Sequence, residues 1–186
     1  DGALRVGKTS VDDGVEAAGG FDIDLGKAGA GNFVFHGEGF YRTADDYKIP
    51  GFAESARLRA AEEAAGEVDE HDEEEGFGVV ENTGLETKGG SAGLSYVTDN
   101  GFAGFSGTAL NTEYGVPGHS HEGEEGGVTI ALKQRRIDFN SELDADFLLF
   151  TKAKLRIGYA DYTHSEIEPT GEVGTVFSNE GVEGRL

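Results

Sequence analysis

Two of the five histidines stand one residue apart, within YGVPGHSHEGEEGG at 114–127. Imidazole nitrogens bind borderline cations such as Zn²⁺, and carboxylates can complete the coordination. In an extended segment His119 and His121 project to the same side, so both rings can reach one ion. The neighbouring glycines would let a carboxylate fold back onto that ion. The candidates are Glu122, Glu124 and Glu125. The pattern alone leaves two interpretations open, a solvated loop tip and a metal-binding loop.

A second histidine lies in an acidic run, EVDEHDEEEG at 67–76. His71 and Asp72 could act as a weak trap that raises the local concentration of cations by electrostatic focusing. The alternative is a disordered, solvated acidic run, which the composition favours.

The other candidate residues are His36, Glu38 and His164. His36 and Glu38 alternate with apolar residues, so they would share the polar face of one strand. They could line a substrate path, or they could make ordinary hydrogen bonds and ion pairs. His164 stands beside acidic residues near the start of a long link, where it is a further candidate ligand.

Composition narrows the function classes. The 186 residues carry a formal net charge of −21, which argues against a nucleic-acid partner. Without cysteine there is no disulfide and no thiol-based zinc or redox site. Ser, His and Asp do not occur at the spacing of any known catalytic motif. We therefore expect a protein that is not an enzyme and needs no cofactor, and the acidic composition suggests cations as its partners.

Period-two alternation of apolar and polar residues dominates the chain and predicts an all-β fold. The clearest case is LLFTKAKLRIGYADY at 148–162, where Lys152, Lys154 and Arg156 alternate with an apolar row. Such a strand suits a transmembrane β-barrel, with lipid on one side and a wet lumen on the other. We expect about eight antiparallel strands. They cover 2–10, 14–26, 31–43, 84–98, 102–112, 127–143, 147–162 and 173–186.

The expected links alternate in length. KAGAG (27–31), DNG (99–101) and DAD (144–146) read as short turns. The links at 44–83, 113–126 and 163–172 are long and acidic, whereas SVDD (10–13) is an exception. Short turns at one end and long loops at the other are typical of an up-and-down outer-membrane barrel. Within the first long loop, the Ala- and Glu-rich start of 52–75 predicts a short helix, followed by the acidic tract.

Shorter strands carry weaker versions of the same pattern. Their apolar rows would be Ala92, Leu94 and Tyr96 in one strand and Phe102, Gly104 and Ser106 in the next. In a third strand the apolar phase slips after Leu132, to Ile137 and Phe139. Either a β-bulge or a passage out of the apolar zone would explain this slip.

Four stretches carry a resemblance to a known family. They are GEGFYRTADDYKIPGFAES (37–55), NTEYGVPGHSH (111–121), LKQRRIDFNSEL (132–143) and LRIGYADYTHSEIEPTGEVGTVFSNEGVEGRL (155–186). In this order they resemble the barrel of TonB-dependent outer-membrane receptors, close to the group associated with zinc uptake. The resemblance implies transport of a metal ion or metal complex across the Gram-negative outer membrane, with zinc or another divalent cation as the substrate. It also favours the metal-binding interpretation of His119 and His121. It also implies contact with outer-membrane lipid.

The family's plug domain has no counterpart in these residues, and the family's barrel has 22 strands. We therefore expect residues 1–186 to form an internal part of a larger barrel. A TonB energy-coupling complex would be a partner through the missing plug. Two alternatives remain open: a small eight-stranded outer-membrane barrel acting as an adhesin or anchor, and a soluble, acidic, secreted all-β protein.

Overall fold

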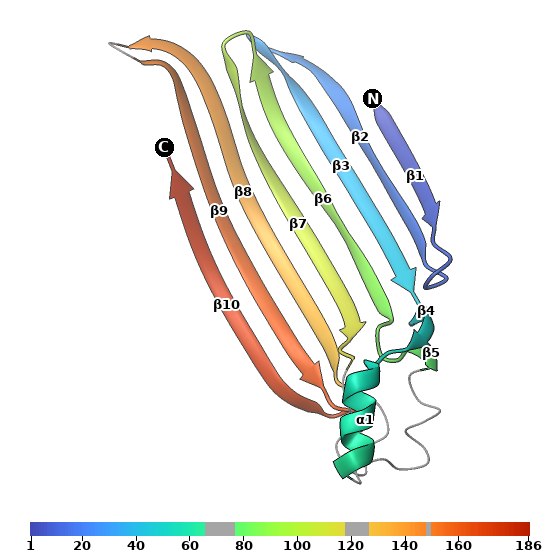
Figure 1. Cartoon of the computed structure of the whole chain (residues 1–186). Coiled ribbons are helices and arrows are strands. Elements are labelled where there is room, and N and C mark those ends of the chain that lie inside the picture. The colour runs from blue at the N-terminus through green and yellow to red at the C-terminus, as the bar shows by residue number, and fades with distance from the viewer. Residues whose placement is uncertain (66–76, 118–126, 148–149) are drawn as a thin grey trace.

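The computed structural model describes residues 1–65, 77–117, 127–147 and 150–186. Eight long strands form one antiparallel sheet in the order β1-β2-β3-β6-β7-β8-β9-β10 (Figure 1). This confirms the expected up-and-down arrangement of eight strands. The strands are β1 (Gly2–Lys8), β2 (Val15–Ala28), β3 (Gly31–Ala44), β6 (Leu85–Thr98), β7 (Gly101–Gly115), β8 (Thr129–Phe147), β9 (Phe150–Ile167) and β10 (Val173–Arg185).

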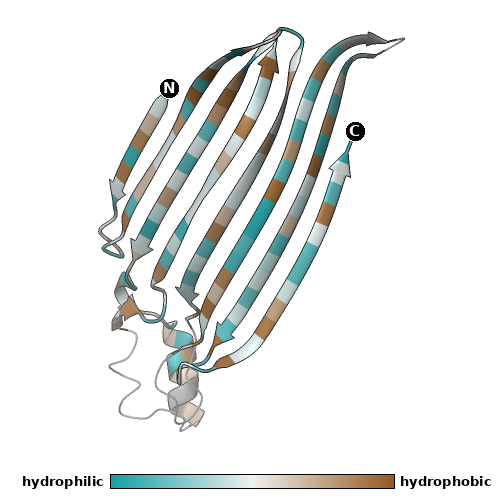
Figure 2. Ribbon diagram, turned by 180° about the vertical axis from the view of Figure 1, so that it is seen from behind, coloured by the Kyte–Doolittle hydropathy of each residue, from teal (hydrophilic) through white to brown (hydrophobic). Residues whose placement is uncertain are grey.

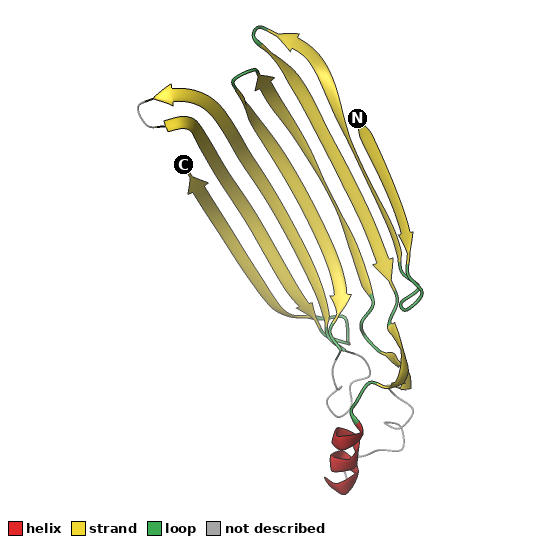
Figure 3. Ribbon diagram, turned by 45° about the horizontal axis from the view of Figure 1, so that its top comes forward, coloured by secondary structure: helices red, strands yellow, loops and turns green. Residues whose placement is uncertain are grey.

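The sheet is open. β1 pairs only with β2, and β10 pairs only with β9, so each has one edge without a neighbour among the described strands. Figure 3 shows these two strands at opposite edges of the sheet. A closed barrel would have no such edges.

The links separate by length as expected. The turns at residues 29–30 and 99–100 lie at one end of the sheet, and Gly29 adopts a φ of 63° in the first of them. The links at 9–14, 45–84, 116–128 and 168–172 lie at the other end, which we call the long-loop end (Figure 1). The short link after β1 therefore belongs with the long loops.

The long-loop end carries a small substructure. β4 (Tyr47–Phe52) pairs with β5 (Phe77–Val80), and α1 covers Ala56–Ala65, which confirms the short helix expected there. Ser55 caps α1 by accepting from the backbone N–H of Leu58 at 3.2 Å. The guanidinium of Arg59 lies 3.7 Å from the centroid of the Phe52 ring, which packs α1 against β4. No helix in the described parts of the chain has the length and apolar character needed to cross a membrane.

The register of the large sheet separates its side chains onto two different faces. One row across six neighbouring strands is apolar throughout; it is Ile23, Phe35, Leu94, Phe105, Phe139 and Ile157. We call the side that carries this row the apolar face. The next row, on the opposite side, holds only polar residues and glycine; it is Asp22, His36, Gly93, Ser106, Asp138, Gly158 and Glu183. We call that side the charged face. Figure 2 shows the resulting alternation of hydropathy along each strand.

The sheet leaves large apolar side chains exposed to an extent that is unusual in a soluble protein. Ile137 is 60% exposed, whereas the side chain of its neighbour Asp138 is 20% exposed. Among the described residues, only Ala44 and Ile130 are buried apolar side chains. The chain exposes 13269 Å², whereas a compact monomer of 19.6 kDa would expose about 8,600 Å². The sheet therefore has no hydrophobic core of its own.

Three details of the expected pattern are resolved by the register. In β7 the apolar face carries Phe105, while Phe102 lies on the charged face, so the apolar row expected in that strand was wrong. Residues 144–146 belong to β8 rather than to a turn, and the register of β8 shifts between Asp144 and Phe147. β8 keeps an unbroken register from Thr129 to Asp144, so no bulge causes the change of apolar phase.

Candidate functional site

One group of polar contacts on the charged face joins β2, β3 and β6. His36 Nδ1 lies 2.5 Å from Asp22 Oδ1, and Glu38 Oε1 accepts from Ser91 Oγ at 2.9 Å. His36 and Glu38 do share one face of β3, as the alternation predicts. Each side chain is held by a different neighbouring strand. The pair therefore forms part of a polar surface rather than a converging ligand set.

A second group of contacts on the charged face joins β8, β9 and β10. Glu142 accepts from Lys154 Nζ at 2.9 Å and also pairs with Lys152. Arg136 donates to Asp138 and, through Nη2, to Glu183 Oε1 at 2.5 Å. These pairs connect cations and carboxylates within β8, between β8 and β9, and from β8 across β9 to β10. The charged face is therefore largely neutralised within itself.

His164 has apolar and aromatic surroundings. Its Nδ1 lies 3.2 Å from the hydroxyl oxygen of Tyr162, and its ring meets Phe177 edge-on at 5.4 Å. Its Nε2 is buried and has no hydrogen-bond partner among the described residues. Asp161, one of the acidic residues beside it in the sequence, lies on the opposite face of the sheet, across from Arg135. The carboxylate of Asp161 therefore does not lie beside the ring of His164.

The bases of the two longest loops are fastened to each other by Asn82. Its Nδ2 donates to the carbonyl of Val116 at 2.8 Å and to the carbonyl of Val128 at 3.0 Å. Asn82 adopts a φ of 55°, a left-handed conformation that asparagine tolerates better than most residues. Gly127 permits this close approach, because a Cβ there would lie 2.1 Å from Asn82 Nδ2. The loop that carries His119 therefore starts and ends beside the end of the 45–84 loop.

Charged side chains also fasten the turn between β1 and β2. Asp12 is 2% exposed and accepts from Thr9 Oγ1 and from the backbone N–H of Gly14. The hydrogen bond from Thr9 is the main reason that the pKa of Asp12 lies below its ordinary value. Burial acts in the opposite direction and tends to raise this pKa. Asp13 pairs with Lys48 of β4, which lowers the pKa of Asp13 and raises the pKa of Lys48. This turn is thereby tied to the base of the 45–84 loop.

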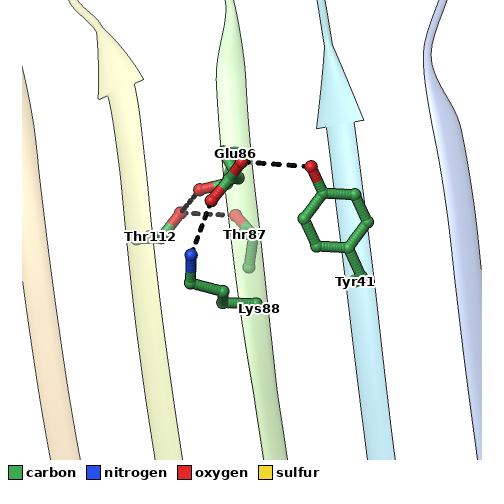
Figure 4. A network of polar contacts seen from close by, with 5 residues as sticks. All are labelled: Tyr41, Glu86, Thr87, Lys88 and Thr112. Carbon is green, nitrogen blue, oxygen red and sulfur yellow. Dashed lines mark hydrogen bonds and ion pairs between the residues drawn. The ribbon is translucent and has the colours of Figure 1, made fainter.

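The apolar face becomes polar toward the long-loop end. Glu86 lies between Tyr41, whose hydroxyl donates to it at 3.0 Å, and Lys88, whose Nζ lies at 2.8 Å (Figure 4). Beside this group is a depression of about 370 Å³. It is lined by Glu86, Lys88, Asn111, Thr112, Glu113, Ala131, Leu132, Lys133 and Arg135.

The candidate ligands named first lie outside the described residues. This holds for His119, His121, Glu122, Glu124, Glu125, His71 and Asp72. Within the described ranges, no group of three or more histidine, aspartate or glutamate side chains is placed to hold a metal ion. The zinc interpretation therefore stays a prediction about the loops.

Two cations on the apolar face, Lys133 and Arg135, were not predicted as site residues. Lys133 and Arg135 were visible only as part of the basic stretch KQRR at 133–136. Their spacing of two residues was the available signal, because it places both side chains on one face of a strand. No known protein-family model matches the chain.

Proposed function

We propose that the chain forms part of the wall and the outward loops of an outer-membrane β-barrel transporter that takes up a metal ion or metal complex, with zinc favoured. The observation that carries the proposal is the apolar row from Ile23 to Ile157, whose side chains are exposed or half-buried, with an ion-paired polar face behind it. An apolar face turned to lipid and a polar face turned to a lumen would satisfy both surfaces.

The exposed area favours this proposal over the soluble alternative. Phe105 is 63% exposed and Ile137 is 60% exposed, and neither has a second layer of structure to pack against. Burial of apolar surface is the main driving force for folding in water, so a sheet of this kind would be poorly stabilised there. In a bilayer the same side chains would be in contact with lipid.

The open edges favour a larger barrel over a complete eight-stranded adhesin or anchor. An eight-stranded barrel would pair β1 with β10, yet each of them pairs with one strand only. In the proposed protein, further strands close the barrel. The resemblance to TonB-dependent receptors supplies the energy source, namely a TonB complex that acts through a plug domain.

The loops supply the proposed capture step. In this proposal His119 and His121 bind the cation first, and the acidic tract around His71 raises its local concentration. The clamp made by Asn82 supports the proposal because it keeps the bases of these two loops together. The charged face, with His36 and Glu38, would line the path that the cation then follows.

Two experiments test the proposal. Fractionation of cells that express the full-length protein should find it in the outer membrane; recovery in a soluble fraction would overturn the membrane placement. In a zinc titration, the purified His119→Ala/His121→Ala protein should bind zinc at least about tenfold more weakly than the parent protein does. Ser120→Ala is the matched control, since it alters the same loop and keeps both imidazoles. Equal affinity in all three proteins would overturn the role of the loop.

A further inference from the structure

Two cations lie on the apolar face of β8, between its apolar residues and the long-loop end of the sheet. Arg135 follows Ile137 on that face, and Lys133 follows Arg135, at intervals of about 7 Å. Lys88 lies in the same row as Lys133, with Asn111 between them on β7. The three cations therefore gather where this face of the sheet changes from apolar to polar.

Lys133 and Arg135 differ in their pairing from Lys88 and from most cations on the charged face. On the charged face Arg5, Arg136 and Lys154 form ion pairs with carboxylates. Among the described residues, Lys133 and Arg135 form none, although Asp161 lies opposite Arg135 in the register. In a chain with a net charge of −21, carboxylates are abundant. The two cations thus retain their capacity to bind an external anion.

Hydrogen bonds and an ion pair hold the side chains around the depression in place. Arg135 Nη1 donates to the carbonyls of Gln134 and Leu110 and to Asn111 Oδ1, at 2.9, 3.3 and 3.2 Å. These bonds leave the other guanidinium nitrogens of Arg135 available, and a guanidinium fork suits phosphate oxygens. Glu86, held by the hydroxyl of Tyr41, fixes the amine of Lys88 (Figure 4).

The charge of the lining favours an anion, though not strongly. Lys88, Lys133 and Arg135 face two carboxylates, and Glu86 is neutralised by its pair with Lys88. Glu113 forms no ion pair among the described residues, so it opposes an incoming anion. Glu113 therefore offers an internal control. Its removal should strengthen anion binding, whereas removal of the cations should weaken it.

We infer that this depression binds the phosphate group of a lipid in the membrane leaflet nearest the long-loop end. The inference rests on the proposed membrane placement. Acyl chains of the lipid would cover Ile137 and Tyr159, which lie side by side on β8 and β9. Its phosphate would then lie level with Arg135 and Lys133. A soluble substrate would approach along the charged face, on the other side of the sheet.

The test uses the purified full-length protein in detergent micelles, titrated with fluorescent lipid A as the phosphorylated lipid. Each basic residue near a charged lipid surface contributes about fivefold in affinity, so Lys133→Gln/Arg135→Gln should bind about 30-fold more weakly. Glu113→Gln should bind more tightly. Lys152→Gln/Lys154→Gln is the matched control, since it removes the same charge from the charged face and should leave binding unchanged.

Three results would overturn the inference. They are equal affinity of Lys133→Gln/Arg135→Gln and the parent, equal binding of dephosphorylated lipid A, and displacement of the lipid by inorganic phosphate at similar affinity. Outer-membrane fractionation of the same variants separates the two proposals. A protein found in the membrane with unchanged lipid affinity contradicts only the phosphate site, whereas a soluble protein contradicts the proposed function.

Discussion

Arg135 and Ile137 occupy successive positions on the apolar face of β8, and the character of that face changes between them. On β9 the same change occurs between Asp161 and Tyr159, which are their partners in the register. The boundary is thus shared by neighbouring strands. It divides the sheet into an apolar zone toward the short turns and a polar zone toward the long loops.

A charged substitution in the apolar zone should lower the stability of the folded protein only when it lies on the apolar face. Under the proposed membrane placement, Phe105→Arg should destabilise the folded protein in lipid by about 2–4 kcal/mol, because it would place a cation in the hydrocarbon region. Ser106→Arg, the next residue, lies opposite Asp138 on the charged face and should be tolerated. Urea titration of the folded fraction in lipid vesicles measures both. A larger cost for Ser106→Arg would mean that the two faces are assigned the wrong way round.

The turn between β1 and β2 should open at both extremes of pH. The pKa of Asp12 is lowered below 3.8, so the stability it contributes is complete above that value and is lost as pH falls through the lowered pKa. The pKa of Lys48 is raised above 10.5, so its contribution is complete below that value and is lost as pH rises through the raised pKa.

Amide exchange of Asp45 and Lys48 reports on this turn, because their N–H groups donate to the carbonyls of Asp12 and Val11. We expect protection from about pH 4 to pH 10, with loss on either side. In Lys48→Met the alkaline loss should disappear, because the titrating amine is absent. Persistence of that loss in Lys48→Met would contradict the assignment.

The Asn82 clamp should control the order of the loop base around Val116 and Val128. Asn82→Gly removes both side-chain bonds but retains a residue that accepts a φ of 55°, whereas Asn82→Ala also adds backbone strain. We expect faster proteolysis between residues 116 and 128 in both variants, and a greater increase for alanine. Unchanged cleavage in the glycine variant would show that the side chain does not hold the loop.

A glycine on the apolar face of β3 should be hard to replace. A Cβ at Gly37 would lie 2.8 Å from the ring of Phe21, whereas a Cβ at Gly39 would have no atom closer than 3.6 Å. Gly37→Val should therefore cost about 0.5–1.5 kcal/mol, because the ring of Phe21 must shift, and Gly39→Val should be nearly neutral. Urea titration in vesicles compares them. Phe21→Ala should abolish most of the difference, since it removes the ring.

The alternation of residue types predicted the faces of β3 and β9, because their apolar and polar residues differ sharply along the strand. It failed in β7, where small residues fill many positions on both sides and one phenylalanine, Phe102 or Phe105, lies on each side, so that two phases stay open. Phe105 belongs to the apolar face only because it pairs with Leu94 and Phe139 on neighbouring strands. Pairing of this kind is a property of the assembled sheet.

The Asn82 clamp could not be predicted for a related reason. Its two acceptors lie 34 and 46 residues farther along the chain, and nothing local to Asn82 identifies them. A left-handed asparagine next to Thr83 and Gly84 reads only as a turn. The fold brings the three segments together, and only then does the side chain act on the loop that carries the histidines.

The two open edges dictate the order of events during assembly. Along the edges of β1 and β10, about half of the backbone N–H and C=O groups point away from the sheet. Each such group costs several kcal/mol in hydrocarbon, so the penalty accumulates along the 13 residues of β10. In the proposed membrane protein, insertion into a bilayer would therefore be coupled to pairing of β1 and β10 with further strands. A partly inserted sheet with either edge open would be a high-energy intermediate, so the strand that pairs first with β10 would determine whether the sheet can enter the membrane.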